Sequence, residues 1–452
     1  MPMKHESGWK KKSKTEIADL FEFSEGYKKF LDEAKTEREA VRAIQDILSV
    51  SGFSQDWVAD KAYSINRGKE IIVFVKGTQS LADGFNIIVA HVDAPRLDLK
   101  QNPLYEDVGL GLLKTHYYGG IKKYQWVATP LALHGVLVKP DGREINLVIG
   151  ENEDEPVFSI DDLLPHLSRK TQDEKKLSEA IDGEKLTLLF GSIPLNGEDK
   201  DAVKKYILNI LHEKYGIEEE DFVSAEIEVV PAFKARDVGI DKSMIGAYGQ
   251  DDRVSAYTLL KAISEVLEPK RSCLAIFVDK EEIGSEGNTS MRSHFFRVFI
   301  DEMCEKLKLN CSEALIRKML FQSRALSADV NGAMNPTFQD VHEKQNACYL
   351  GRGLCITKFT GHGGKVGAND AHAEYVAEIR RIFNNKGILW QTGELGKIDE
   401  GGGGTVAKFL AEYGMDIIDC GTPILSMHSP FEISSKLDVY ETYRAFKAFL
   451  RS

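Results

Sequence analysis

An apolar run at residues 273–278, which ends in Asp279, Lys280, Glu281 and Glu282, constrains the fold of this chain most. A short run so rich in β-branched and aromatic residues is typical of a strand that is covered on both faces. In open α/β sheets, the carboxyl ends of the strands face the ligand crevice. Because neighbouring side chains on an extended chain point in opposite directions, one glutamate can bind a metal while the other faces a substrate. The alternative for an isolated pair of glutamates is a solvated acidic turn.

The pattern along the chain predicts two domains, because 452 residues exceed a single ordinary core. Strand patterns alternate with helical periodicity in 1–98 and 232–452, which predicts an α/β fold with a mainly parallel sheet flanked by helices. Residues 99–231 instead show short alternating runs between Gly and Pro turns, which predict antiparallel strands. We interpret this segment as an inserted, largely β domain.

Composition limits the classes of partner. The formal net charge of −12 argues against nucleic acid. No apolar run approaches the roughly 18 residues of a membrane span, and the polar, basic start lacks the apolar stretch of a secretory leader. We therefore expect a cytoplasmic protein with no membrane partner. The six cysteines form no CxxC pair, and we interpret all of them as reduced thiols.

Histidines and further acids stand at other predicted strand ends. His91 and Asp93 follow the apolar run 86–90, and Asp329 follows another strand. Asp251 opens a predicted helix, where an N-cap is the alternative role, and His428 follows an apolar run. A lone histidine in such a place is also typical of a hydrogen-bonded structural residue. Together with the glutamates, these five segments supply the bridging carboxylate and the N/O ligands that a site for two metal ions needs.

Five ordered motifs resemble those of the M18 aminopeptidases, the aspartyl aminopeptidase family. These motifs lie at residues 91–96, 250–253, 279–285, 327–329 and 427–430. The resemblance covers nearly the whole chain and implies a zinc exopeptidase-like catalytic domain with two zinc ions per subunit, with cobalt and manganese as alternative metals. It implies that one zinc is held by His91, Asp251 and Asp329. The other zinc would be held by Asp251, Glu282 and His428, so Asp251 would bridge the two ions.

The same resemblance implies roles around the metals. Glu281 would be the general base, and Asp93 would orient His91. The implied activity is removal of the N-terminal residue from peptides, and the family name adds a preference for N-terminal Asp or Glu. Two other interpretations share parts of the pattern. One is a metal-dependent deacylase of N-acyl amino acids, and the other is a non-catalytic assembly protein whose acids are structural.

For the insertion, the resemblance implies a dimerisation domain and a homo-oligomer in which dimers assemble into a tetrahedral dodecamer. His166 resembles a histidine that reaches a neighbouring subunit's active site, with a surface histidine as the alternative. Lys358 resembles a basic residue that meets an acidic substrate side chain. The segments 330–336 and 393–404 depart from the eukaryotic members, and the latter looks like the bacterial branch. These departures bear on the preference for acidic residues and leave the zinc motifs intact.

Overall fold

The computed structural model describes residues 6–57 and 60–452. The chain divides into two compact units. The larger unit comprises Met1–Ala94, Ala235–Met427 and Phe431–Ser452, and the smaller unit comprises Pro95–Lys234 and His428–Pro430. The insertion that we expected at 99–231 lies inside the smaller unit. Of the predicted site residues, His166 and His428 fall in the smaller unit, and the others fall in the larger one.

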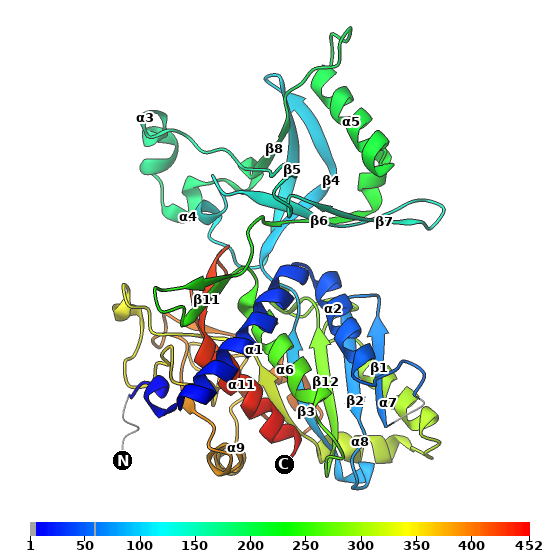
Figure 1. Ribbon diagram of the computed structural model, residues 1–452, viewed down its shortest axis with the longest axis vertical. Helices are drawn as coiled ribbons and strands as arrows, with labels where there is room; N and C mark the ends of the chain where they lie inside the picture. Colours follow the sequence, from blue (N-terminus) through cyan, green and yellow to red (C-terminus); the bar gives the residue numbers. More distant parts are fainter. Residues whose placement is uncertain (1–5, 58–59) are drawn as a thin grey trace. The chain divides into compact units, whose positions relative to one another are not determined.

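An eight-stranded sheet forms the centre of the larger unit (Figure 1). In spatial order its strands are β1 (Lys61–Asn66), β2 (Glu70–Val75), β12 (Ser272–Val278), β3 (Phe85–His91), β13 (Arg324–Ala328), β19 (Asp416–Gly421), β15 (Leu354–Thr357) and β17 (Trp390–Thr392). The four central strands, β12, β3, β13 and β19, are mutually parallel. Strands β1, β2 and β12 form antiparallel pairs, and β15 runs antiparallel to β19. The predicted α/β fold is confirmed, with the parallel strands at the centre of the sheet.

Helices pack on both faces of this sheet (Figure 1). One layer contains α1 (Lys14–Glu33), α2 (Glu37–Val50), α6 (Gln250–Ser264), α9 (Ala373–Asn385) and α11 (Lys436–Leu450). The other contains α7 (Phe295–Lys306), α8 (Glu313–Phe321) and α10 (Ala407–Ala411). Along β12, Ala275 and Phe277 pack with the first layer, whereas Ile276 and Val278 pack with the second. Burial on both faces explains why this strand is apolar without alternation.

A five-stranded sheet also belongs to the larger unit. Its order is β10 (Arg236–Val238), β11 (Met244–Ala247), β21 (Glu432–Ser435), β20 (Pro423–Leu425) and β14 (Asn331–Gly332). Strand β14 begins two residues after Asp329, and β11 ends shortly before α6. The sheet therefore joins segments that flank two of the predicted metal ligands. A short pair, β16 (Gly361–His362) and β18 (Gly402–Gly403), lies outside both sheets.

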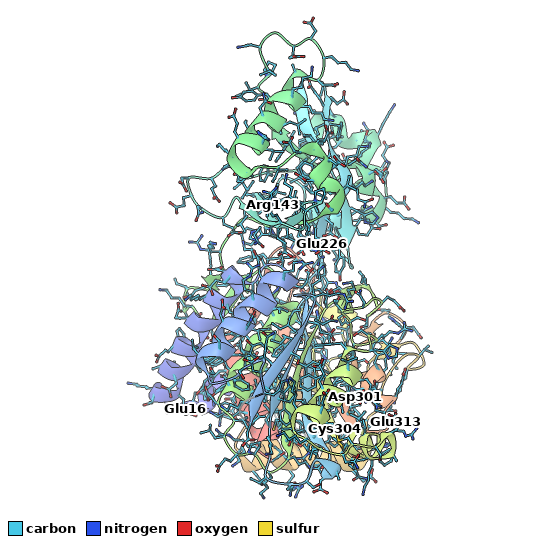
Figure 2. All side chains as sticks on the ribbon, turned by 90° about the vertical axis from the view of Figure 1, so that its right-hand side faces the viewer. Glu16, Arg143, Glu226, Asp301, Cys304 and Glu313 are labelled. Carbon is cyan, nitrogen blue, oxygen red and sulfur yellow. A yellow bond between two sulfur atoms is a disulfide. The ribbon has the colours of Figure 1, made fainter. Side chains whose placement is uncertain are left out.

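The smaller unit is built on a six-stranded antiparallel sheet, as the alternating runs predicted. Its order is β7 (Glu144–Ile149), β6 (Leu131–Val138), β9 (Ala225–Pro231), β4 (Arg96–Asp107), β5 (Leu110–Tyr118) and β8 (Thr187–Gly191). Helix α5 (Ala202–Tyr215) contacts β5, and the short helices α3 (Pro165–Ser168) and α4 (Leu177–Ala180) lie between β7 and β8 in the chain. Figure 2 labels Arg143 and Glu226 on this unit.

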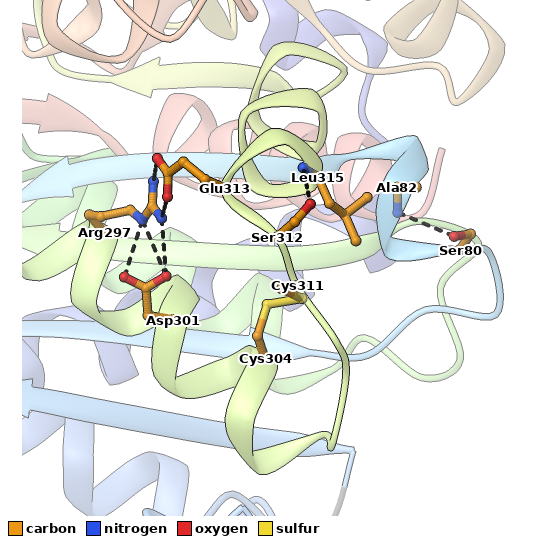
Figure 3. Close-up of a disulfide and its surroundings, with 9 residues drawn as sticks. All are labelled: Ser80, Ala82, Arg297, Asp301, Cys304, Cys311, Ser312, Glu313 and Leu315. Atoms are coloured by element: carbon orange, nitrogen blue, oxygen red, sulfur yellow. Dashed lines mark hydrogen bonds and ion pairs between the residues drawn. A yellow bond between two sulfur atoms is a disulfide. The ribbon is translucent and has the colours of Figure 1, made fainter.

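The interpretation of all six cysteines as reduced thiols is wrong for one pair. Cys304 and Cys311 form a disulfide that links the end of α7 to the segment before α8 (Figure 3). The chain reverses between them, with Lys308 in the left-handed region, so that their Cα atoms lie 6.0 Å apart. Cys273, Cys348, Cys355 and Cys420 are free and buried. Nearby, the Arg297 guanidinium lies between the carboxylates of Asp301 and Glu313 (Figure 3).

Membrane-spanning helices were not expected from the sequence. Within residues 6–57 and 60–452, every helix is too short or too polar to cross a bilayer.

Candidate metal centre

The carboxyl ends of three neighbouring strands carry most of the predicted ligands. Strands β12 and β3 pair in parallel with Val278 opposite His91, and β3 pairs in parallel with β13. His91 is the last residue of β3, Glu281 and Glu282 follow β12, and Asp329 directly follows β13. Because parallel strands end at the same edge, these side chains come from one edge of the sheet. Sequence reasoning predicted this convergence.

His91, Asp251 and Asp329 meet at this edge. The Nε2 atom of His91 lies 3.2 Å from Oδ1 of Asp251 and 3.9 Å from Oδ1 of Asp329. One ligand atom from each residue lies within 4.8 Å of the others. An imidazole and two carboxylates at such spacing fit a divalent ion with N/O ligands, zinc among them. This is the set predicted for one zinc, and its role as a ligand set stays a prediction.

Glu281 and Glu282 form a second group with His91, in which the ligand atoms also lie within 4.8 Å of one another. Both glutamates are half-buried and lie on the single turn Glu281–Ile283. Both carboxylates therefore lie close enough to His91 to share an ion with it. The predicted division of roles, with Glu282 as ligand and Glu281 as base, is compatible with this geometry and stays a prediction.

Burial and mutual repulsion shape the electrostatics of the cluster. Burial raises the pKa of Asp329 well above its usual range, and the neighbouring Asp251 carboxylate adds to this rise. Burial acts to lower the pKa of His91, but hydrogen bonding to Asp251 and Asp93 outweighs it and raises that pKa well above the usual range. Acids and one imidazole gathered away from water favour any added positive charge. A bound divalent cation would supply that charge.

Asp93 connects the histidine to the two glutamates. Its Oδ1 lies 3.2 Å from Nδ1 of His91, and the orienting role stays a prediction. The same carboxylate accepts hydrogen bonds from the backbone N–H groups of Glu281 at 3.1 Å and Glu282 at 3.2 Å. Asp93 therefore also fixes the turn that carries both glutamates. The sequence contains no signal for this second contact, because the partners lie 188 positions apart.

Two further buried acids at the site were not assigned roles from sequence. Asp252 is fully buried, and its Oδ2 accepts a hydrogen bond from the backbone N–H of His91 at 3.4 Å. Glu432 accepts one from the backbone N–H of Asp251 at 3.0 Å. The position of Asp252 beside Asp251 is a signal in the sequence. Glu432 lies just beyond the motif at 427–430 and carries none.

The remaining predicted site residues are His166, His428 and Lys358. His166 is exposed on α3 of the smaller unit. His428 is also assigned to that unit, where its Nδ1 lies 2.9 Å from the carbonyl oxygen of Gly120. Lys358 is exposed and ion-paired with Asp370. It follows β15, whose antiparallel register to β19 directs the chain away from the edge that carries His91. The roles of His166, His428 and Lys358 stay predictions.

Comparison with known proteins gives consistent results. The family model described as aminopeptidase I zinc metalloprotease (M18) matches residues 30–450. A probable M18 family aminopeptidase 1 of Clostridium acetobutylicum is 50% identical, with 99% of this chain and 98% of that protein covered. The crystal structure of the M18 family aminopeptidase from Thermotoga maritima superposes with a TM-score of 0.95 at 49% identity, covering 99% of each chain.

A more distant likeness concerns the fold alone. The structure of the S. cerevisiae mApe1 dodecamer superposes with a TM-score of 0.75 at 19% identity. The alignment covers 94% of this chain and 95% of that one.

Proposed function

The chain belongs to the M18 family of zinc metallo-aminopeptidases, and from that premise we propose that it uses two zinc ions to remove the N-terminal residue of peptides. The observation that carries the proposal is the convergence of His91, Asp251 and Asp329, whose ligand atoms lie within 4.8 Å of one another. We propose these residues as the ligands of one zinc. For the second zinc we propose Asp251, Glu282 and His428, on the strength of the motif resemblance.

Bound zinc supplies Lewis acidity, which makes a nucleophile available from water at neutral pH and polarises the scissile carbonyl group. Glu281 takes up the proton of the attacking water on its carboxylate and later donates it to the leaving amine. Asp93 holds Glu281 in place through the backbone N–H at 3.1 Å and keeps His91 oriented through Nδ1. His91 then presents Nε2, the nitrogen that faces Asp251, to the metal.

The proposal does not extend to a preference for acidic N-terminal residues. Lys358, the predicted partner of an acidic substrate side chain, has its charge offset by Asp370. Asp370 also pairs with Lys365 at 2.8 Å, so both lysines already face a carboxylate. We therefore propose an aminopeptidase whose preferred N-terminal residue is set by groups other than Lys358.

We also propose that the chain works as a homo-oligomer, with the smaller unit as the dimerisation domain of a tetrahedral dodecamer. Exposed apolar side chains support this. On the segment around α3 and α4, Leu164, Leu167 and Leu177 are 50%, 64% and 61% exposed. Exposed apolar side chains that form a patch mark protein interfaces, which is the role we propose for these leucines. A mass measurement in solution tests the proposal, and a monomeric protein would contradict it.

One experiment separates the aminopeptidase from its alternatives. Purified protein is loaded with zinc, its zinc content per chain is measured, and hydrolysis of a free dipeptide is compared with hydrolysis of its N-acetyl form. We expect two zinc ions per chain and cleavage of the free dipeptide only. Preferential cleavage of the acetylated form would indicate the deacylase. Protein that binds no zinc and cleaves neither would indicate the assembly protein.

A further inference from the structure

Glu432 is a buried carboxylate that contacts the backbone of a proposed zinc ligand. It opens β21 and is 1% exposed. Its Oε2 accepts a hydrogen bond from the N–H of Asp251 at 3.0 Å. Hydrogen bonds to an ionised carboxylate are roughly twice as strong as those between neutral groups. Loss of this acceptor would therefore weaken the hold on the backbone of Asp251.

The backbone at Asp251 needs an anchor because it is not helical. Although α6 begins at Gln250, Gly249 has φ 70°, Asp251 has φ −81° and ψ 106°, and Asp252 has φ −115° and ψ 31°. N–H groups at the start of a helix lack an acceptor within the helix. The direction of the Asp251 side chain therefore depends on what holds this backbone from outside, and Glu432 holds its N–H.

The residue before Asp251 is anchored to the same strand. Gln250 is fully buried, and its Nε2 donates to the carbonyl oxygens of Glu432 at 2.7 Å and of Ile245 at 3.2 Å. Its Oε1 accepts hydrogen bonds from the hydroxyl groups of Tyr27, at 3.2 Å, and Ser434. Gln250 and Asp251 are thus both hydrogen-bonded to β21. Glu432 accepts one bond from each, through its carbonyl oxygen from Gln250 and through its carboxylate from Asp251.

We propose that Glu432 is a positioning residue of the zinc site. By holding the N–H of Asp251, it directs the Asp251 carboxylate toward His91, where Oδ1 lies 3.2 Å from Nε2. This inference rests on the proposed function, in which Asp251 bridges two zinc ions. Glu432 acts through Asp251 and need not contact an ion itself. Residues that orient metal ligands in this way change metal affinity by about 10- to 100-fold when they are substituted.

Two substitutions of Glu432 distinguish the effect of side-chain length from the effect of charge. Glu432→Asp keeps the charge but shortens the side chain by one methylene, so its oxygens no longer reach the Asp251 N–H. Glu432→Gln removes the charge but keeps an oxygen at the same distance. The matched control is Asp438→Asn, which alters another fully buried carboxylate that accepts backbone N–H bonds, here from Gly351 and Gly353.

The zinc dissociation constant of each full-length variant is measured by competition with a fluorescent zinc chelator, and the absorption spectrum of the cobalt-loaded protein reports the ligand geometry. We expect Glu432→Asp to weaken zinc binding by about 10- to 100-fold and to change the cobalt spectrum. Glu432→Gln should weaken it less, and Asp438→Asn should leave both readouts unchanged.

Several outcomes would overturn the inference. A stronger or equal effect of Glu432→Gln would mean that the charge matters rather than the hydrogen bond. An equal effect of Asp438→Asn would mean that the loss reflects general stability. If the unsubstituted protein binds two zinc ions and both Glu432 variants bind them equally well, this inference fails alone. If the unsubstituted protein binds no zinc, the proposed function fails and this inference fails with it.

Discussion

Two groups of carboxylates in the larger unit have opposite surroundings. Asp438 on α11 is completely buried, and its two oxygens accept hydrogen bonds from the N–H groups of Gly351 and Gly353, each at 2.6 Å. At the strand ends, Asp251 and Asp329 instead approach His91 and each other. A buried acid that backbone amides satisfy serves the fold. Acids gathered around one imidazole are stabilised by a bound cation. Zinc is the metal of this family.

Among the tests of this comparison, substitution of Glu281 should have the largest effect on activity. We expect Glu281→Gln to lower kcat by about 10²- to 10⁴-fold, because the amide cannot take up the proton of the attacking water. Zinc content should be unchanged, since Glu281 is not a proposed ligand. The measurement combines steady-state hydrolysis of an aminoacyl anilide with metal analysis of the same sample. Turnover close to that of the unsubstituted enzyme would remove Glu281 from its assigned role.

Removal of zinc tests whether the strand-end acids need a cation. We expect zinc at about 100 times its Kd to raise the free energy of unfolding by about 3 kcal/mol over protein treated with a chelator. The Asp438→Asn variant should show the same gain, because residue 438 contacts the N–H groups of Gly351 and Gly353 and does not belong to the cluster at His91. Urea unfolding with and without zinc provides the measurement. If the gain depends on Asp438, or if the unsubstituted protein shows no gain, the distinction between Asp438 and the strand-end acids is wrong.

Asp93 combines the features of the cluster and of Asp438, because it contacts His91 and also accepts hydrogen bonds from backbone N–H groups. Asp93→Asn keeps the size of the side chain but replaces one acceptor oxygen by an NH₂ group, which in either orientation faces a backbone N–H of the glutamate turn. We expect zinc affinity or kcat to fall by about 10- to 100-fold. Zinc titration and steady-state kinetics on one preparation measure both quantities. If neither changes, Asp93 is only a structural acid like Asp438.

The last prediction concerns the pH dependence of the free energy of unfolding at Asp438. Burial raises the pKa of Asp438 to about 8, against the effect of the Gly351 and Gly353 N–H bonds. In the unfolded chain an aspartate has a pKa of about 3.9, so between these values the folded protein holds a proton that the unfolded chain has released. This contribution to stability is fully present below about pH 4 and is lost as the pH rises through about 8.

Asp438→Asn should therefore flatten the fall in stability between pH 5 and pH 8. Urea unfolding of the two chelator-treated proteins at both pH values measures the difference, in which titration of all other groups cancels. An identical pH dependence in the two proteins would show that Asp438 is ionised in the folded state. The N–H bonds of Gly351 and Gly353 would then lower its pKa more than burial raises it.

Sequence reasoning succeeded where the chemistry is local to a strand end. The apolar run 273–278 and the acids that follow it predicted a central strand with a functional terminus, and parallel pairing with β3 then brings His91 alongside. That alignment depends on the carboxyl ends of parallel strands meeting at one edge. The set of His91, Asp251 and Asp329 as ligands came from the motif resemblance, and it stays a prediction.

Sequence reasoning failed where strand direction or distant contacts decide the outcome. Nothing in the residues around Lys358 reveals that β15 runs antiparallel to β19, and the role predicted for Lys358 stays a prediction. The spacing between Cys304 and Cys311 has no recognised pattern, so their disulfide depended on a chain reversal that only the fold displays. The contacts of Glu432 and of Asp93 with backbone N–H groups likewise arise from tertiary structure.

The bond between Asp93 and the turn at Glu281 joins segments 188 positions apart, and their strands are direct neighbours in the central sheet. During synthesis, β3 leaves the ribosome long before its partner exists and must remain unpaired while the intervening residues are made. Pairings of such high contact order form slowly. A metal site that uses groups from both strands therefore requires this long-range pairing, and recovery of zinc uptake after dilution from denaturant would report when the pairing has formed.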